Sequence, residues 1–244
     1  RNLGLIEENL SKPNGMMLFV GPSGSGKTTM VHSCLEHLNT PRVKIFTVEN
    51  PVEIVQTGLR QIQIDEKNEL TYLKAINSLA DADADVVFLG ELDDKETAGV
   101  ALETALTGRL ILSTLRLNST IDAIRYMLNL ELNPMNLAQG LLLIGAQRFV
   151  VTLCKTCKEG YHPDKDEFDQ LMQEYGKEGF PKLGIKYTDK IKLYKPAGCG
   201  KCNGSGYSGR TCIYEIMQMT PSIKQLIVDK ADLKQIQIQA IHEG

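Results

Sequence analysis

The segment that constrains the architecture most is Gly21-Pro22-Ser23-Gly24-Ser25-Gly26-Lys27-Thr28. It matches the pattern G-x-x-x-x-G-K-[ST], which is typical of a phosphate-binding loop between a strand and a helix. The context agrees, because an apolar run at 16–20 precedes the segment and a helical pattern at 28–38 follows it. Glycines let successive backbone N–H groups converge on an anion, and the helix N-terminus adds partial positive charge. We therefore expect a phosphate-binding loop rather than a plain glycine-rich turn.

The polar side chains of this loop have expected roles. Lys27 is predicted to reach the β- and γ-phosphates of a nucleotide, and the Thr28 hydroxyl to ligate Mg²⁺. The motif thus predicts a nucleotide with β- and γ-phosphates, together with Mg²⁺. The residues expected to contact the nucleotide are Gly21, Pro22, Ser23, Gly24, Ser25, Gly26, Lys27, Thr28 and Thr29.

Two acids stand at the ends of apolar runs. Glu91 follows the run at 85–89, and Glu49 follows the run at 43–48. Ligands bind beyond the carboxyl ends of the strands in parallel sheets, so both acids are predicted to be catalytic. Glu91 would coordinate Mg²⁺ through water and polarise the attacking water, and Glu49 would face the same crevice. The alternatives are a solvated loop acid for Glu91 and a helix-capping or loop acid for Glu49.

Short apolar runs alternate with helical patterns from residue 16 to about residue 147. These runs predict buried strands at 16–20, 43–48, 85–89 and 110–113. Capping signals at Ser119 and Asn133 mark helix starts after the last of these runs. The alternation predicts an α/β fold with a mainly parallel sheet.

The character of the chain changes after about residue 149. Strand–helix alternation is lost between Cys154 and Cys212, apart from a short charged helical pattern at 164–178. A Thr220-Pro221 pair and Asp232 then open two further helical patterns. We therefore predict three parts: a nucleotide-binding core at 1–148, a small module at 149–219 and C-terminal helices at 220–244. The chain begins with Arg1 and stops just after a helical pattern, so we expect a fragment of a longer protein.

Four cysteines form two C-x-x-C pairs, Cys154 with Cys157 and Cys199 with Cys202. Two such pairs supply four thiolates, which complete a tetrahedral and purely structural Zn²⁺ site. The alternatives are a disulfide or free thiols, and His162 as a replacement ligand. Paired C-x-x-C motifs in a chain with an ample core favour a reducing compartment, and we expect the cytoplasm.

The remaining histidines and cysteines carry no metal-ligand spacing. His32, His37 and His242 fall in helical patterns and are interpreted as surface or packing residues. Cys34 and Cys212 are interpreted as small core residues.

Composition limits the function classes. Of the 244 residues 42% are hydrophobic and 23% charged, which excludes wholesale disorder. The net charge is −3 and the pI about 5.9, which argues against a nucleic-acid protein held by a basic surface. The most apolar region, at 137–153, is interrupted by Gln139, Gly140, Gln147 and Arg148 and predicts a buried helix and strand rather than a membrane span.

In their order along the chain, these motifs resemble the secretion ATPases of type II secretion and type IV pilus assembly. The resemblance covers nearly the whole chain and is carried by the two cysteine pairs and by residues 21–28, 46–53, 85–91, 105–115, 145–150 and 206–211. It implies a RecA-like motor core that acts as a homohexamer, attached peripherally at the cytoplasmic face of the inner membrane. It also implies inner-membrane platform proteins of the secretion or pilus machine as partners, no nucleic acid, and a separate N-terminal domain outside this chain.

Several positions depart from the family pattern. Asp93 stands where the family has an arginine, and two further family arginines align with Asn77 and Asp81. Two family histidines align with Arg109 and Arg116. Cations stabilise the charge that develops on a transferred phosphoryl group, and losing one can cost ~10³–10⁵ in rate. The two new arginines offer fixed positive charge instead, although a guanidinium cannot relay protons.

Three functions are therefore weighed. The first is an ATP-hydrolysing motor subunit for protein secretion or pilus assembly, with Lys27, Thr28, Glu91 and Glu49 at the nucleotide. The second is a nucleotide-binding subunit of the same machinery with little or no hydrolysis, suggested by the lost arginines and histidines. The third, a RecA-like nucleic-acid motor, is disfavoured by the acidic pI.

Overall fold

The computed structural model describes residues 2–79, 82–176 and 179–244. The helices are α1 (Asn2–Leu10), α2 (Lys27–Leu38), α3 (Tyr72–Leu79), α4 (Lys95–Leu106), α5 (Thr120–Asn129), α6 (Pro134–Gly140), α7 (Lys165–Tyr175), α8 (Pro221–Val228) and α9 (Leu233–Glu243). The strands are β1 (Gly15–Val20), β2 (Ile45–Glu49), β3 (Arg60–Gln63), β4 (Val86–Glu91), β5 (Leu110–Leu115), β6 (Leu141–Leu153), β7 (Glu159–Tyr161), β8 (Leu193–Lys195) and β9 (Tyr207–Gln218).

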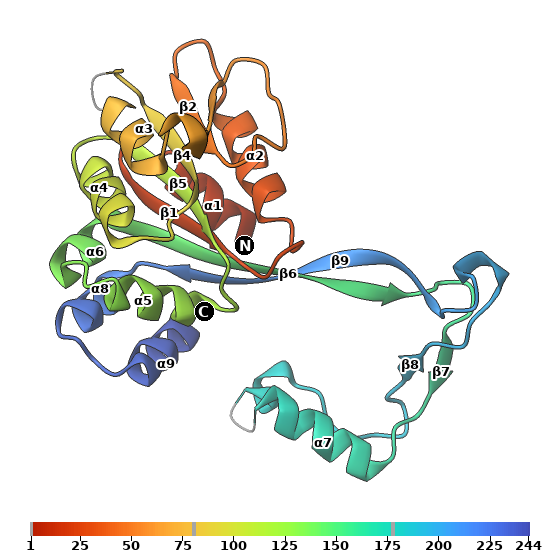
Figure 1. Cartoon of the computed structure of the whole chain (residues 1–244). Coiled ribbons are helices and arrows are strands. Elements are labelled where there is room, and N and C mark those ends of the chain that lie inside the picture. Colours follow the sequence, from red (N-terminus) through yellow and green to blue (C-terminus); the bar gives the residue numbers. More distant parts are fainter. Residues whose placement is uncertain (1, 80–81, 177–178) are drawn as a thin grey trace. The chain divides into compact units, whose positions relative to one another are not determined.

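Seven strands form one sheet in the order β3-β2-β4-β5-β1-β6-β9 (Figure 1). β1 runs parallel to β5 and β6, β2 runs parallel to β3 and β4, and β4 runs parallel to β5. The predicted α/β class with a mainly parallel sheet is therefore confirmed. Because β1, β2, β4 and β5 are parallel, the loops that follow them meet at one edge of the sheet.

The core explains why the central strands are continuous apolar runs. Along β1, Met16 and Leu18 belong to one hydrophobic cluster, whereas Met17 and Phe19 belong to the other. Helices α3, α4, α5, α6, α8 and α9 contribute to the first cluster, and α1 and α2 to the second. Both faces of the sheet are thus covered, and alternate residues of each strand are buried on opposite sides.

The predicted strands and the predicted helices are present, with ends that differ by a few residues. Several elements were not expected, among them helix α1, strand β3 and helix α3. Strand β3 has the sequence Arg-Gln-Ile-Gln, so it lacks the apolar run by which the other strands were recognised. The long strand β9 also went unrecognised, because most of its residues are exposed and do not alternate.

By packing, the chain divides into two units. One contains residues 1–149 and 213–244, and the other contains residues 150–212. Residues 213–219 and the C-terminal helices group with the first unit because Met217, Met219, Ile223, Ile227 and Ile236 are buried in its core. In the sequence-based division, these residues belong to the small module and to the separate C-terminal helices. Its division at 148/149 and 219/220 stays a prediction about functional parts.

The second unit has a small core of its own. Strands β7 and β8 pair antiparallel, and the ring of Phe168 on α7 packs edge-on against Phe180, with 5.4 Å between ring centroids. Phe168 is the one residue of α7 that is buried. The stability of the second unit therefore depends little on the burial of apolar side chains.

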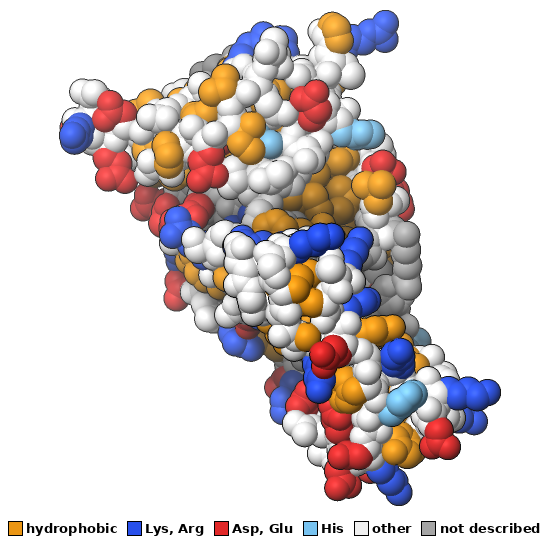
Figure 2. Space-filling view, turned by 90° about the vertical axis from the view of Figure 1, so that its right-hand side faces the viewer, with side chains coloured by type: hydrophobic (Ala, Val, Ile, Leu, Met, Phe, Trp, Pro, Cys, Tyr) orange, Lys and Arg blue, Asp and Glu red, His pale blue; other side chains and the backbone are white. Residues whose placement is uncertain are grey.

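Acidic and basic side chains are intermingled on the face of the molecule drawn in Figure 2. In the part of the chain that the structure describes, no helix combines the length and apolar character needed to cross a bilayer.

Candidate nucleotide-binding site

The glycine-rich loop lies at the carboxyl end of β1, and α2 begins at Lys27. Gly26 is the N-cap of α2 and has φ +87°, a left-handed conformation that glycine adopts without strain. A Cβ at Gly26 would lie 2.7 Å from the Gln147 side-chain nitrogen and 3.0 Å from the Phe149 ring. The loop therefore needs glycine here for both its backbone conformation and its packing.

Lys27 is buried within the loop that it follows. Its Nζ donates to the carbonyl oxygens of Gly21, at 2.8 Å, and Pro22, at 3.1 Å. Burial lowers the pKa of Lys27, and the Glu91 carboxylate partly opposes this shift. Among the described residues, the buried Ser25 hydroxyl has no hydrogen-bond partner. A cradle of backbone N–H groups with a buried ammonium and an unpaired hydroxyl fits a phosphate group.

A cavity of about 400 Å³ opens in front of this loop. It is lined by residues from β2, β4, β5 and the loop itself. Of the residues predicted from the sequence, the lining includes Ser23, Gly24, Gly26, Lys27, Thr28, Thr29, Glu49 and Glu91. Gly21, Pro22 and Ser25 shape the loop without lining the cavity. The structure thus brings both predicted acids to the phosphate-binding loop.

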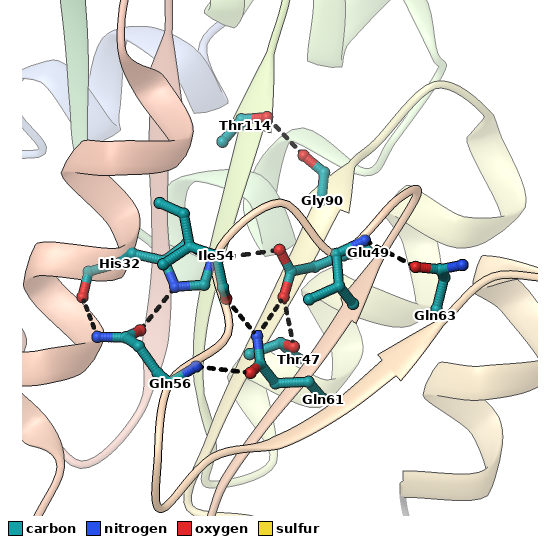
Figure 3. Close-up of polar contacts among 10 residues, drawn as sticks. His32, Thr47, Glu49, Ile54, Gln56, Gln61, Gln63, Gly90 and Thr114 are labelled. Carbon is teal, nitrogen blue, oxygen red and sulfur yellow. Dashed lines mark hydrogen bonds and ion pairs between the residues drawn. The ribbon is translucent and has the colours of Figure 1, made fainter.

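The Glu91 side chain reaches the cavity through an irregularity in β4. The β4–β5 register shifts between Leu89 and Glu91, and the Thr114 hydroxyl donates to the carbonyl of Gly90 (Figure 3). Such a bulge re-aims the next side chain. Gly90 permits it, because a Cβ there would lie 2.7 Å from the Tyr72 hydroxyl. Burial, followed by the charge of Glu91, raises the pKa of Tyr72 to about 12.

Glu49 is held by a buried network (Figure 3). Its Oε1 accepts hydrogen bonds from the Thr47 hydroxyl, at 2.7 Å, and the Gln61 side-chain amide, at 3.1 Å. Its Oε2 lies 3.2 Å from Nε2 of His32. Burial alone would raise the pKa of Glu49, but the hydrogen bonds from His32, Thr47 and Gln61 outweigh burial, so the pKa is lowered. Glu49 is therefore neither a solvated loop acid nor a helix cap.

His32 is a site residue that the sequence analysis missed. It had been interpreted as a surface or packing histidine, yet its imidazole is buried and contacts both Glu49 and Gln56. The helical spacing of His32 does not reveal this role, because its partners Glu49 and Gln56 lie outside α2.

Arg109 and Arg116 lie at opposite ends of β5. Arg116 follows β5, lines the cavity and pairs with Glu91, with 2.5 Å between its Nε and Oε1 of Glu91. Arg109 precedes β5 and is absent from the cavity lining. Of the two arginines, only Arg116 therefore adds positive charge to the lining of this cavity.

The departures at the arginine positions fall into different environments. Asp93 lines a neighbouring cavity together with Glu91, and burial, followed by the Glu91 charge, raises the pKa of Asp93. It does not line the cavity at the phosphate-binding loop. Asn77 is exposed on α3, and Asp81 lies outside the described residues.

The two cysteine pairs form a separate cluster in the second unit. The Sγ atoms of Cys154, Cys157, Cys199 and Cys202 all lie within 4.8 Å of one another. The Cys157–Cys202 and Cys199–Cys202 sulfur separations are 3.7 Å and 3.8 Å. A tetrahedral Zn²⁺ with bonds of about 2.3 Å requires sulfur separations of about 3.8 Å, so the four thiols fit zinc.

The alternatives to a zinc site fit these distances less well. All four cysteines are free thiols, and the separations are too long for disulfides. His162 is directed elsewhere, because its Nδ1 lies 2.7 Å from the backbone carbonyl of Ile191. Backbone N–H groups of Cys199 and Gly206 each lie 3.2 Å from the Cys202 sulfur. These hydrogen bonds help to lower the pKa of Cys202 to about 6 although burial opposes the shift.

A parallel sheet with a phosphate-binding loop at its carboxyl edge defines the class of P-loop α/β proteins. The chain belongs to the family described as "Type II/IV secretion system protein", whose model matches residues 1–244. The resemblance noted in the sequence is thereby confirmed.

Named relatives fall on both branches of this family. The chain is 36% identical over 244 residues to the type II secretion system protein E of Pseudomonas aeruginosa, covering 100% of this chain and 46% of that protein. It is 37% identical over 238 residues to the type IV pilus assembly ATPase PilB of the same organism, covering 96% of this chain and 40% of that protein. The chain therefore spans less than half the length of these relatives.

Solved structures share the fold at lower identity. The pilus retraction motor PilT with bound ADP superimposes with a TM-score of 0.68 at 24% identity, over 98% of this chain and 56% of that chain. The ATPase DotB of Legionella pneumophila gives a TM-score of 0.62 at 18% identity, over 98% of this chain and 54% of that chain.

Proposed function

We propose that this chain is the ATP-hydrolysing motor part of a subunit that powers type II protein secretion or type IV pilus assembly. The observation that carries the proposal is the cavity at the phosphate-binding loop, because two acids from adjacent strands, Glu49 and Glu91, reach it. Relatives named as secretion and pilus ATPases support the choice of machinery.

Each residue of the cavity has a role under this proposal. The loop amides and the Lys27 ammonium bind the β- and γ-phosphates of ATP, and the Thr28 hydroxyl holds Mg²⁺. Bound Mg²⁺ supplies charge neutralisation at the phosphates. Glu91 accepts the proton of the attacking water, and Glu49 helps to orient that water. Arg116, which lines the same cavity, supplies a fixed positive charge where the family has a histidine.

The rest of the chain supports this motor. The four-cysteine cluster binds Zn²⁺ as a structural ion, which orders the small module. The active form is a homohexamer at the cytoplasmic face of the inner membrane, where it acts on membrane platform proteins. These assignments follow the family and the cysteine geometry.

One observation favours a second candidate, a nucleotide-binding subunit with little turnover. Arg116 pairs closely with Glu91, and an acid occupied by a guanidinium is less available to orient water. Asp93 adds negative charge beside Glu91. The two candidates share nucleotide binding and differ only in hydrolysis.

The test measures Mg-ATP affinity and turnover with the chain fused to a ring-forming hexameric partner. Lys27→Ala should weaken affinity about 100-fold, because it removes a buried charged hydrogen-bond donor. Lys44→Ala is the matched control, since Lys44 is paired with Asp83 at the surface. Glu91→Gln should reduce turnover about 10²–10⁴-fold while nucleotide still binds. Unchanged affinity in Lys27→Ala contradicts the proposal, and binding without turnover in the parent chain favours the second candidate.

A further inference from the structure

His32 and Glu49 form a buried pair that the phosphate chemistry alone does not explain. Their side chains are each 3% exposed, and Nε2 of His32 lies 3.2 Å from Oε2 of Glu49 (Figure 3). His32 comes from α2, and Glu49 is the last residue of β2. His32 does not line the cavity, so its role concerns Glu49 rather than the nucleotide.

The hydrogen-bond partners of Gln56 determine which nitrogen of His32 carries a proton. The Gln56 amide nitrogen donates to the backbone carbonyl of His32, at 3.2 Å, and to the Glu36 carboxylate, at 2.9 Å. Both partners only accept, so the amide cannot be flipped. Its oxygen therefore faces Nδ1 of His32, at 2.6 Å, and Nδ1 must be an N–H donor.

The second nitrogen of His32 then meets an acceptor as well. With a proton on Nδ1, a neutral imidazole would present the lone pair of Nε2 to the Glu49 carboxylate. Two acceptors do not face each other at 3.2 Å inside a protein core without a proton between them. The pair must therefore hold one further proton, either on Nε2 or on Glu49.

The surroundings of Glu49 favour the proton on His32. Oε1 of Glu49 already accepts from Thr47 and from Gln61. The Gln61 amide is oriented by the backbone, because its nitrogen also donates to the Ile54 carbonyl and its oxygen accepts from the Gln56 N–H. Hydrogen bonds of this kind stabilise the ionised carboxylate. The result is an imidazolium paired with a carboxylate.

The charged groups around His32 also favour the protonated form of its imidazole. Glu49 on β2, Glu53 in the following loop and Glu36 on α2, which is linked through Gln56, are all acidic. On β4, Phe88 packs edge-on against the imidazole and carries no charge. Burial opposes protonation, but the hydrogen bonds to Glu49 and Gln56 outweigh it, so the pKa of His32 is raised.

We propose that His32 is a positioning residue that shares one proton with Glu49 and thereby fixes the Glu49 carboxylate at the nucleotide cavity. This inference rests on the proposed function, in which Glu49 acts on the attacking water. Helix α2 begins at Lys27, within the phosphate-binding motif. The His32–Glu49 pair therefore also connects Glu49 to the helix that follows this loop. Loss of the shared proton at alkaline pH leaves two facing acceptors, which releases the carboxylate.

The first test reads the proton directly and needs no turnover. The chain is labelled with ¹⁵N in histidine, and the His32 signals are assigned by their loss in His32→Gln. Both ring nitrogens of His32 should stay protonated above pH 6.5, the ordinary pKa of histidine. In Glu49→Gln the carboxylate is gone, so burial should shift the His32 titration below its ordinary value. A neutral His32 in the parent above pH 6.5, or a His32 titration that is unchanged in Glu49→Gln, overturns the proposal.

The second test reads the effect on catalysis. His32→Phe keeps an aromatic ring beside Phe88 but no donor, and we expect kcat to fall about tenfold with KM unchanged. His32→Gln can still donate to Glu49 without titrating, so it should retain most of the activity and lose the alkaline fall of kcat that His32 causes. His37→Gln, an exposed histidine on the same helix, is the control and should keep the parent profile. The same alkaline fall in His32→Gln and the parent overturns the proposal.

The two tests separate this inference from the function on which it rests. If the parent chain binds or hydrolyses no ATP, the proposed function fails, while the ¹⁵N titration still decides whether His32 and Glu49 share a proton. If turnover is present but the titration shows a neutral His32, the function stands and the positioning role is wrong.

Discussion

The Nε atom of Arg116 lies 2.5 Å from Oε1 of Glu91, at the carboxyl edge of the parallel sheet. Arg116 is largely exposed, whereas Glu91 is 25% exposed, so the arginine reaches inward from the solvent side. The Glu91 carboxylate raises the pKa of the Arg116 guanidinium still further, which leaves its positive charge permanent. Arg116 thus places a fixed cation beside Glu91 at the cavity.

Replacing this arginine should reveal whether the cation assists or restrains the chemistry. We expect Arg116→Ala to lower turnover about 10³-fold, because the cavity loses a cation that, under the proposed function, stabilises the charge on the transferred phosphoryl group. Arg116→Lys should recover part of the activity, since it keeps the charge but loses the planar guanidinium. Steady-state Mg-ATP hydrolysis measures both. Arg125→Ala, which removes an ion pair with Asp122 outside the cavity, is the control. A rise in turnover on removing Arg116 would show instead that the pair with Glu91 is inhibitory.

The bulge that directs Glu91 toward the cavity should depend on Gly90. In Gly90→Ala the new Cβ would lie 2.7 Å from the Tyr72 hydroxyl oxygen, which must move. We expect a loss of about 1–3 kcal/mol in unfolding free energy, as for other overpacked sites, together with reduced turnover. Tyr72→Phe removes the obstructing oxygen, so the double variant should be more stable than Gly90→Ala alone. Urea denaturation of the two single variants and the double variant measures this coupling, and additive losses would be inconsistent with the steric explanation.

Local patterns were sufficient for the features that depend on neighbouring residues. The phosphate-binding loop was predictable because its glycines, Lys27 and Thr28 act at fixed spacing within one turn. The central strands were predictable because both of their faces are buried, which makes them apolar throughout. The cysteine cluster was predictable from two C-x-x-C pairs, although their separation along the chain does not reveal the sulfur geometry.

Features that depend on tertiary placement could not be predicted. Arg109 and Arg116 look equivalent in the sequence, yet a strand of six residues separates them by about 20 Å. Of these two arginines, only Arg116, which follows the strand, lines the cavity. His32 and Glu49 are 17 residues apart, and their contact exists because α2 packs on one face of the sheet to which β2 belongs. A helical pattern around His32 is compatible with packing, with exposure or with an ion pair.

Metal removal should affect the two units differently. The second unit, residues 150–212, has a small apolar core, so most of its order should come from Zn²⁺ held by four thiolates. Structural zinc returns on the order of 10 kcal/mol of binding free energy to folding. We expect a chelator to abolish amide-exchange protection in the second unit. Protection in the first unit, residues 1–149 and 213–244, should stay intact. Amide hydrogen exchange followed by mass spectrometry measures both units in one experiment.

Two single-cysteine variants, a test variant and its control, complete the zinc experiment. Cys157→Ser should lower the zinc content of the purified chain well below one ion per chain, because it removes one of four ligands. Cys212→Ser, outside the four-cysteine cluster, should leave the zinc content unchanged. Protection of residues 150–212 that survives both chelation and Cys157→Ser would show that the unit folds without metal.

The buried His32–Glu49 pair should also shape the pH dependence of stability. The pKa of His32 is raised, so its contribution is complete below its ordinary value of 6.5 and is lost as the pH rises through the higher folded-state pKa. The pKa of Glu49 is lowered, so its contribution is complete above its ordinary value of 4.5 and is lost as the pH falls through the lower folded-state pKa. Both contributions are therefore complete between pH 4.5 and 6.5.

Comparing the parent with His32→Phe isolates this effect, because the variant leaves a buried carboxylate without its cationic partner. We expect the variant to be less stable by about 3 kcal/mol between pH 4.5 and 6.5, with the difference shrinking on both the acid and the alkaline side. Urea denaturation across a pH series gives the difference at each pH. His37→Phe on the exposed side of the same helix should show no such maximum. A difference that stays constant with pH would mean that His32 contributes packing alone, and that the proton between His32 and Glu49 has no energetic consequence.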